Sequence, residues 1–123
     1  MAMSNLLKRM VLMASMLGII LLAMPGTSSA EDVWCYSSNG FSYYLSSDTV
    51  KVKNAHPPYR GYVKIVNEND GKLWNFFICG FANENDIVYG YTLSRGTGDW
   101  GTGERISKNP LYYAVWQAMK PYL

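Results

Sequence analysis

Apolar and polar residues alternate along most of the chain after residue 30, and this alternation predicts β-strands. Residues 41–46 place Phe41, Tyr43 and Leu45 on one face, and residues 49–53 place two valines on one face and two lysines on the other. Residues 62–66 and 87–93 alternate in the same way. We therefore predict a mostly antiparallel β-sheet of about five to six strands, with a meander at its centre.

One predicted strand, residues 73–81, differs from its neighbours because it is apolar on both faces. Trp74 and Ile78 fall on one face, and Phe77 and Phe81 fall on the other. A strand of this kind is normally central and covered on both sides. We expect it to lie deep in the sheet and to bring Cys79 near the first strand.

Turn signals separate these runs. Asn39-Gly40 lies between two aromatic-rich runs and predicts a hairpin, because both residues tolerate the positive φ of a type I′ turn. Ser47-Asp48 predicts a second turn, and Pro57-Pro58 predicts a loop, because consecutive prolines cannot donate to a ladder. The repeated Asn-Glu-Asn-Asp at residues 67–70 and 83–86 predicts two more turns.

The chain ends in a predicted helix. Asn109 can cap it, Pro110 suits its first turn, and Pro121 stops it. Its apolar stripe at helical spacing consists of Leu111, Ala114, Val115, Ala118 and Met119. The predicted fold class is α+β, a mostly antiparallel sheet covered by one short C-terminal helix.

The first thirty residues have the pattern of a secretory signal peptide. Lys8 and Arg9 precede an apolar run at residues 11–24, and small residues end at Ala30. The run is shorter than the roughly 20 residues that span a bilayer, so a retained anchor is the weaker reading. We predict a cleaved signal at residues 1–30, a single domain at residues 31–123, and a secreted, periplasmic or cell-surface protein with no stable membrane span after cleavage.

Removal of the signal changes the charge. Without Lys8 and Arg9, the eleven Lys and Arg become nine, which equals the nine Asp and Glu. A basic footprint for nucleic acid is therefore missing, and we expect no nucleic-acid partner. All ten Tyr, four Trp and four Phe lie after residue 30, and large buried rings help a small domain to form a core.

Cys35 and Cys79 are the two cysteines of the chain. An even count in an exported domain favours a disulfide between them, and two buried free thiols are the alternative. A metal site is not expected, because His56 is the one histidine and lies in a predicted loop, and zinc needs about four ligands.

The sequence contains partial matches to calcium-binding and dinucleotide-binding motifs, but the residues around them do not fit either site. The acidic-amide turns lack calcium-loop spacing, because the twelfth residue, with Asn67 counted as the first, is Ile78 where a glutamate is needed. Residues 96–101 spell G-x-G-x-x-G, but no helix opens within them, so a dinucleotide site is not expected. With no inferable nucleophile and base, we predict that the protein is not an enzyme and takes no cofactor.

Four aromatic residues are candidates for partner contact: Trp100, Tyr59, Trp116 and Tyr112. Trp100 is flanked by glycines, and it either folds back onto the core or projects as a contact site. Tyr112 and Trp116 are spaced i, i+4 beside the apolar stripe of the helix. Aromatic anchors are enriched at interfaces, which is the reason for choosing these side chains.

The order of features resembles small exported bacterial proteins of the surface-adhesin E type. It consists of an export signal, Trp34, the tyrosine-rich residues 43–50, alternating strands and a late helix. The chain departs from that type in its glycine-rich loop and lacks a late cysteine. The resemblance implies a helix-covered sheet and contact with a protein or with a cell-wall or host-surface component. A small inhibitor of a cell-wall hydrolase is the alternative function.

Overall fold

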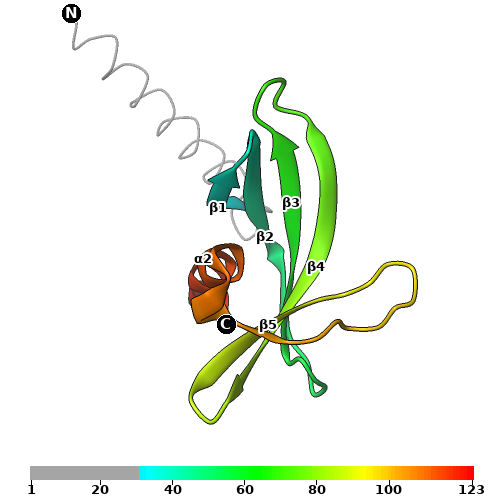
Figure 1. Ribbon diagram of the computed structural model, residues 1–123, viewed down its shortest axis with the longest axis vertical. Helices are drawn as coiled ribbons and strands as arrows, with labels where there is room; N and C mark the ends of the chain where they lie inside the picture. The colour runs from blue at the N-terminus through cyan, green and yellow to red at the C-terminus, as the bar shows by residue number, and fades with distance from the viewer. Residues whose placement is uncertain (1–30) are drawn as a thin grey trace, which may run out of the picture.

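The computed structural model describes residues 31–123 as one curled antiparallel sheet with a helix packed on it (Figure 1). The predicted signal peptide, residues 1–30, lies outside the described residues. The six strands follow one another across the sheet in the order of the chain. They are β1 (Asp32–Ser38), β2 (Phe41–Val52), β3 (Tyr59–Asn67), β4 (Leu73–Glu84), β5 (Ile87–Thr92) and β6 (Glu104–Arg105). The predicted fold class is confirmed.

The helix α2 (Pro110–Met119) supplies one side of the core. It lies between two 3-10 turns, η1 (Ile106–Lys108) and η2 (Lys120–Tyr122). Val115 and Met119 are fully buried against the sheet, so the predicted apolar stripe faces the core. The buried core cluster consists of Cys35, Leu45, Val63, Cys79, Phe81, Val115 and Met119.

Local sequence determines the first turn of the sheet and the start of the helix. At the β1–β2 hairpin, Asn39 and Gly40 have φ of 53° and 82°, as the predicted tight turn requires. At the helix start, Asn109 Oδ1 accepts a hydrogen bond from the Tyr112 backbone N–H at 3.0 Å, which is the predicted cap. Asn109 Nδ2 also donates to Glu104 Oε1 at 2.7 Å and so ties the cap to β6.

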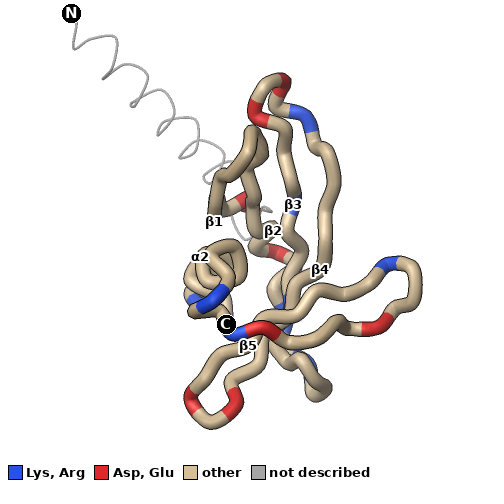
Figure 2. The backbone as a smooth tube through the Cα atoms, viewed as in Figure 1, with Lys and Arg blue, Asp and Glu red and all other residues tan. Residues whose placement is uncertain are grey.

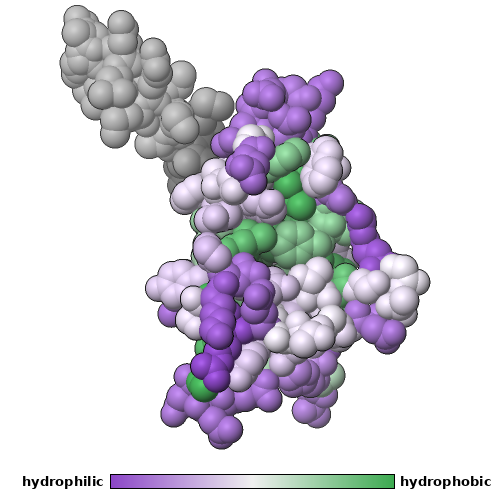
Figure 3. All heavy atoms as spheres, in the orientation of Figure 1, coloured by the Kyte–Doolittle hydropathy of each residue, from purple (hydrophilic) through white to green (hydrophobic). Residues whose placement is uncertain are grey.

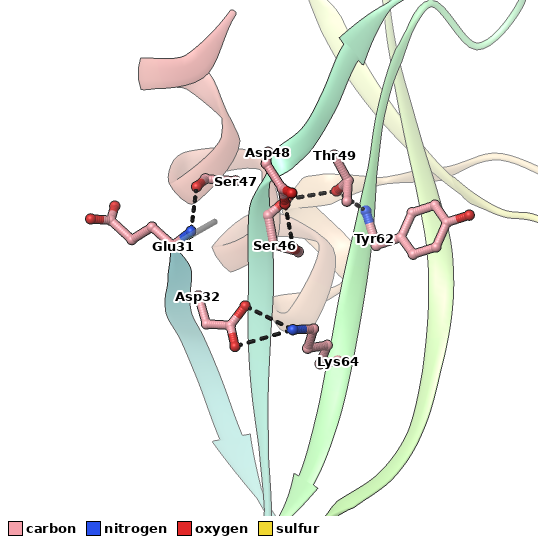
Figure 4. A network of polar contacts seen from close by, with 8 residues as sticks. All are labelled: Glu31, Asp32, Ser46, Ser47, Asp48, Thr49, Tyr62 and Lys64. Carbon is pink, nitrogen blue, oxygen red and sulfur yellow. Dashed lines mark hydrogen bonds and ion pairs between the residues drawn. The ribbon is translucent and has the colours of Figure 1, made fainter. Parts of the chain in front are cut away.

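The predicted turn at Ser47-Asp48 was wrong, because β2 runs through it as one bulged strand. Hydroxyl groups replace the missing ladder contacts there (Figure 4). Thr49 Oγ1 donates to the Ser46 carbonyl at 2.6 Å and accepts from the Tyr62 backbone N–H at 2.8 Å. These bonds hold the strand against β3 across the bulge, so the chain bends without turning back.

The prediction that residues 73–81 are covered on both faces holds only for part of β4. Cys79 and Phe81 are fully buried toward the helix, and Gly80 is buried beneath the Trp100 ring on the opposite face, but Leu73 and Trp74 are 58% and 60% exposed. The helix reaches only part of the sheet, and the Trp74 ring packs on Phe41 at a centroid distance of 4.8 Å. Figure 3 shows hydrophobic side chains exposed over the sheet beside the helix.

The two Asn-Glu-Asn-Asp segments contain turns, at residues 68–70 and 85–86, and these lie at opposite ends of the sheet. Figure 2 shows their acidic residues at the β3–β4 tip and at the β4–β5 tip. The repeated motif therefore does not form one surface. Within residues 31–123, no helix is both long enough and apolar enough to cross a bilayer.

Candidate binding surface

The sheet has one face toward the helix and one face away from it. A Cβ placed on Gly61 would lie 3.0 Å from Met119 of the helix, so odd-numbered residues of β3 face the helix. Side chains alternate along a strand, and therefore Arg60 and Tyr62 lie on the other side, which we call the outer face. Lys51 pairs with Arg60, and Ile78 pairs with Tyr62, so Lys51 and Ile78 also lie on the outer face.

A groove of about 450 Å³ lies along the outer face. Apolar and aromatic groups from β3, β4 and the loop after β5 form part of its lining, namely Tyr62, Ile78, Leu93 and Trp100. Basic side chains from β2, from the residue after it and from β3 form another part, namely Lys51, Lys53 and Arg60. The groove combines a ring surface with positive charge, as many ligand sites do.

Trp100 reaches the groove because its loop folds back onto the sheet. Leu93 and Trp100 form an isolated antiparallel bridge, which brings the indole over Gly80. A Cβ on Gly80 would lie 2.9 Å from that ring, so the glycine provides the space for it. The guanidinium of Arg60 lies over the ring at 5.1 Å, a cation–π contact that holds both groups at the groove.

The charges in the groove are unequal. Among residues 31–123, Asp48 is the one acidic residue in its lining, against three basic residues. The described ion pairs join His56 with Glu84 and Lys64 with Asp32, so none of them neutralises Lys51, Lys53 or Arg60. Figure 2 shows basic positions along the lower parts of β2 and β3. The groove therefore has a local positive potential, although residues 31–123 have no net formal charge.

The other candidate contact residues lie on the helix side of the sheet. Trp116 packs on Tyr59 and Phe81 at centroid distances of 5.7 and 5.2 Å. Tyr112 meets Phe81 edge-on at 6.1 Å, and its hydroxyl is 2.6 Å from Thr92 Oγ1. Tyr59, Tyr112 and Trp116 thus come together as half-buried packing groups, whereas Trp100 lies apart from them at the groove.

The predicted disulfide was wrong, because Cys35 and Cys79 are separate free thiols. Cys35 is the extra residue of a bulge in β1, where its Sγ donates to the Val33 carbonyl at 3.3 Å. Cys79 lies in β4 between Gly61 and Thr92 of the adjacent strands. Both belong to the apolar core, and burial raises the pKa of each thiol. The sulfur atoms serve as core packing.

The groove residues other than Trp100 were not singled out from sequence. The alternation of Lys51 and Lys53 predicted outward side chains, but it gave no sign that Arg60 and Trp100 lie beside them. That proximity depends on the pairing of β2 with β3 and on the return of a distant loop. Tyr62 had one available signal, since it is a large ring at an outward position of an alternating strand.

The fold and the groove define a small α+β domain with a basic, aromatic groove on the outer face of its sheet. Comparisons with known protein families, with curated proteins and with solved structures gave no match for this chain. Within the described part of the chain, no three His, Cys, Asp or Glu side chains are grouped as metal ligands.

Proposed function

We propose that this protein is an exported binding protein without catalytic activity that holds a partner in the groove beside Trp100. The partner is a protein or a component of the cell wall or of a host surface. Secretion through residues 1–30 is part of this proposal, as is the adhesin-like role that the sequence resemblance implies. The groove itself is the observation that carries it.

Two properties of the groove support binding as its role. Its rings are held in place without being buried, since Tyr62 stacks on Phe76 at 5.9 Å and is still 42% exposed. Its cations are free of ion pairs with the described residues. Fixed aromatic groups lose little conformational entropy when a partner arrives, and unpaired cations can bind an acidic group without first breaking an ion pair, which favours affinity.

The test is a binding assay with groove variants. The protein and its Tyr62→Ala and Trp100→Ala variants would be immobilised and exposed to solubilised envelope and host-surface fractions. Bound material would be identified by mass spectrometry and then measured with the purified partner. We expect both variants to weaken binding roughly tenfold or more, as loss of an aromatic anchor commonly does.

Trp74→Ala is the matched control. It removes a more exposed indole from β4, outside the groove, so it should retain the partner. Near-UV circular dichroism and thermal melting would establish that each variant is folded. Groove variants that keep the fold and every partner would refute the proposal, and loss of binding in Trp74→Ala alone would move the site to the exposed end of β4.

A second candidate function is inhibition of a cell-wall hydrolase, and the loop at residues 94–103 favours it. The loop projects beyond the sheet (Figure 1), and internal backbone bonds shape it. Ser94 N–H donates to the Asp99 carbonyl at 2.8 Å, and Gly98 N–H donates to the Ser94 carbonyl at 2.8 Å. A shaped, projecting loop is suited to entering an enzyme cleft.

Inhibition can be measured with a panel of lysozyme-type enzymes. Replacement of residues 95–99 by a short Gly-Ser turn would remove the tip and leave Trp100 in the chain. An inhibitor should lose potency in this variant, whereas a groove-binding protein should keep its partner. Full activity of every enzyme in the presence of excess protein would exclude the inhibitor function for that class.

A further inference from the structure

We infer that the ligand of the Trp100 groove is an acidic oligosaccharide, whose acid groups pair with the lysines while its sugar rings lie on the aromatic side chains. This inference rests on the proposed function, because it names the class of ligand for the same groove. Carboxylate and sulfate sugars share the required chemistry, and the experiment separates the two.

Charge complementarity is the first step of the argument. Lys51 of β2 and Lys53, the residue just after β2, are two residues apart and both exposed, and both line the groove, so their ammonium groups lie on the same side of the chain. Arg60 lies opposite Lys51 in the register and keeps its guanidinium on the outer face over Trp100. A ligand with acid groups at intervals can meet all three cations, while a neutral ligand leaves them without partners.

The rings are the second step. Tyr62 and Trp100 line the same groove as these cations, together with Ile78 of β4 and Leu93, which follows β5. Sugar rings have apolar C–H faces that pack on aromatic groups, and their hydroxyl groups remain in water above a shallow groove. A simple inorganic anion would use the charges and leave the rings without a role.

The position of the groove argues against an acidic peptide as the ligand. Extended peptides commonly bind by adding a strand to a free sheet edge. Arg60 and Tyr62 belong to β3, which pairs with β2 on one side and with β4 on the other. The backbone around the centre of the groove is therefore occupied by the ladder, and recognition falls to side chains, which suits a charged sugar.

The experiment measures binding of fluorescent oligosaccharides to the chain expressed in full. An oligogalacturonate presents carboxylates, a sulfated malto-oligosaccharide presents sulfates alone, and the unsulfated malto-oligosaccharide of equal length is the neutral probe. We expect at least one acidic probe to bind, with an affinity that falls as salt is raised, and the neutral probe to bind at least roughly tenfold more weakly. The acidic probe that binds more tightly identifies the acid group.

Lys51→Gln/Lys53→Gln is the test variant, and Lys108→Gln/Lys120→Gln is its matched control. Both remove two positive charges from exposed side chains, but the second pair lies beside the helix and outside the groove. The test variant should lose affinity for the acidic probe by roughly tenfold, and the control should change it less than about twofold.

Each other result overturns the inference. Equal losses in both variants would show attraction to net charge alone. Absence of acidic-sugar binding, together with groove-dependent capture of poly-glutamate or of a protein partner, would overturn the ligand class and leave the proposed function standing. Absence of groove-dependent binding to any probe or partner would end both. Exposed lysine-to-glutamine changes leave the core intact, so a folding defect does not obscure the outcome.

Discussion

At the scale of single residues, Gly90 makes a sharp prediction because an aromatic ring occupies the space above it. A Cβ at this position would lie 2.6 and 2.7 Å from two atoms of the Tyr112 ring. The ring cannot move away cheaply, since its hydroxyl is 2.6 Å from Thr92 Oγ1. We expect Gly90→Ala to lower the free energy of unfolding by roughly 1–3 kcal/mol, measured by urea denaturation.

Gly96→Ala is the control for that measurement. The nearest atom to its added Cβ is Ser94 Oγ at 3.9 Å, and the position lies in the exposed loop. Its effect should stay within about 0.5 kcal/mol. If Gly90→Ala were as mild as Gly96→Ala, the close packing of Tyr112 on β5 would be contradicted.

The two cysteines make a second prediction at this scale. Burial raises the pKa of Cys79 and of Cys35, so neither thiol ionises readily near neutral pH in the folded chain. Iodoacetamide should therefore label neither residue in the native protein and both after denaturation without reductant. Mass spectrometry counts the labels, and their absence from the denatured, unreduced protein would mean that a bridge had formed.

At the scale of elements, Asn109 joins the helix to the sheet. Its side chain accepts from the Tyr112 N–H and donates to Glu104 Oε1, so it serves both α2 and β6. Asn109→Ala should destabilise the protein by roughly 1 kcal/mol, as loss of a cap usually does. Asn109→Ser keeps a capping oxygen and should recover part of that loss in a thermal melt. Equal melting temperatures for all three proteins would show that the cap contributes nothing.

Alternation predicted most strands of the sheet because side-chain period is a local property. Phe41, Tyr43 and Leu45 share a face in both the sequence pattern and the structure. The turn at Ser47-Asp48 could not be distinguished from a bulge by the same means. The choice between a turn and a bulge depends on the hydrogen bond from the Tyr62 backbone N–H to Thr49 Oγ1, which joins residues that are distant in the chain.

At the scale of the whole molecule, the groove shows the limit of prediction from one sequence. Trp100 was identified as a candidate from its glycine neighbours, but its position depends on Gly80, which leaves room for the ring. The sequence around Gly80 carries no sign of that contact. The helix side was more predictable, because the stripe containing Val115 and Met119 needs only an apolar sheet face to cover.

Burial of Cys79 in the core between the sheet and the helix also predicts how the free energy of unfolding depends on pH. In the unfolded chain Cys79 has an ordinary thiol pKa of about 8.5, and burial raises the pKa in the folded protein. Below the unfolded value both states hold the proton and pH has no effect through this group. Above it the unfolded state loses the proton while the folded state keeps it, so stability falls as pH rises, by about 1.4 kcal/mol per pH unit.

Burial also raises the pKa of Cys35 and of Tyr112, which adds to the alkaline loss. Cys79→Ala isolates one contribution, because its packing cost is independent of pH and only the slope reports on the thiol. Urea denaturation at several pH values from 8 to 10.5 should give a shallower decline for this variant, by roughly 1 kcal/mol per pH unit above pH 9. Parallel declines for the two proteins would mean that the Cys79 thiol ionises as easily in the folded chain as in the unfolded one, and would place it outside the dry core.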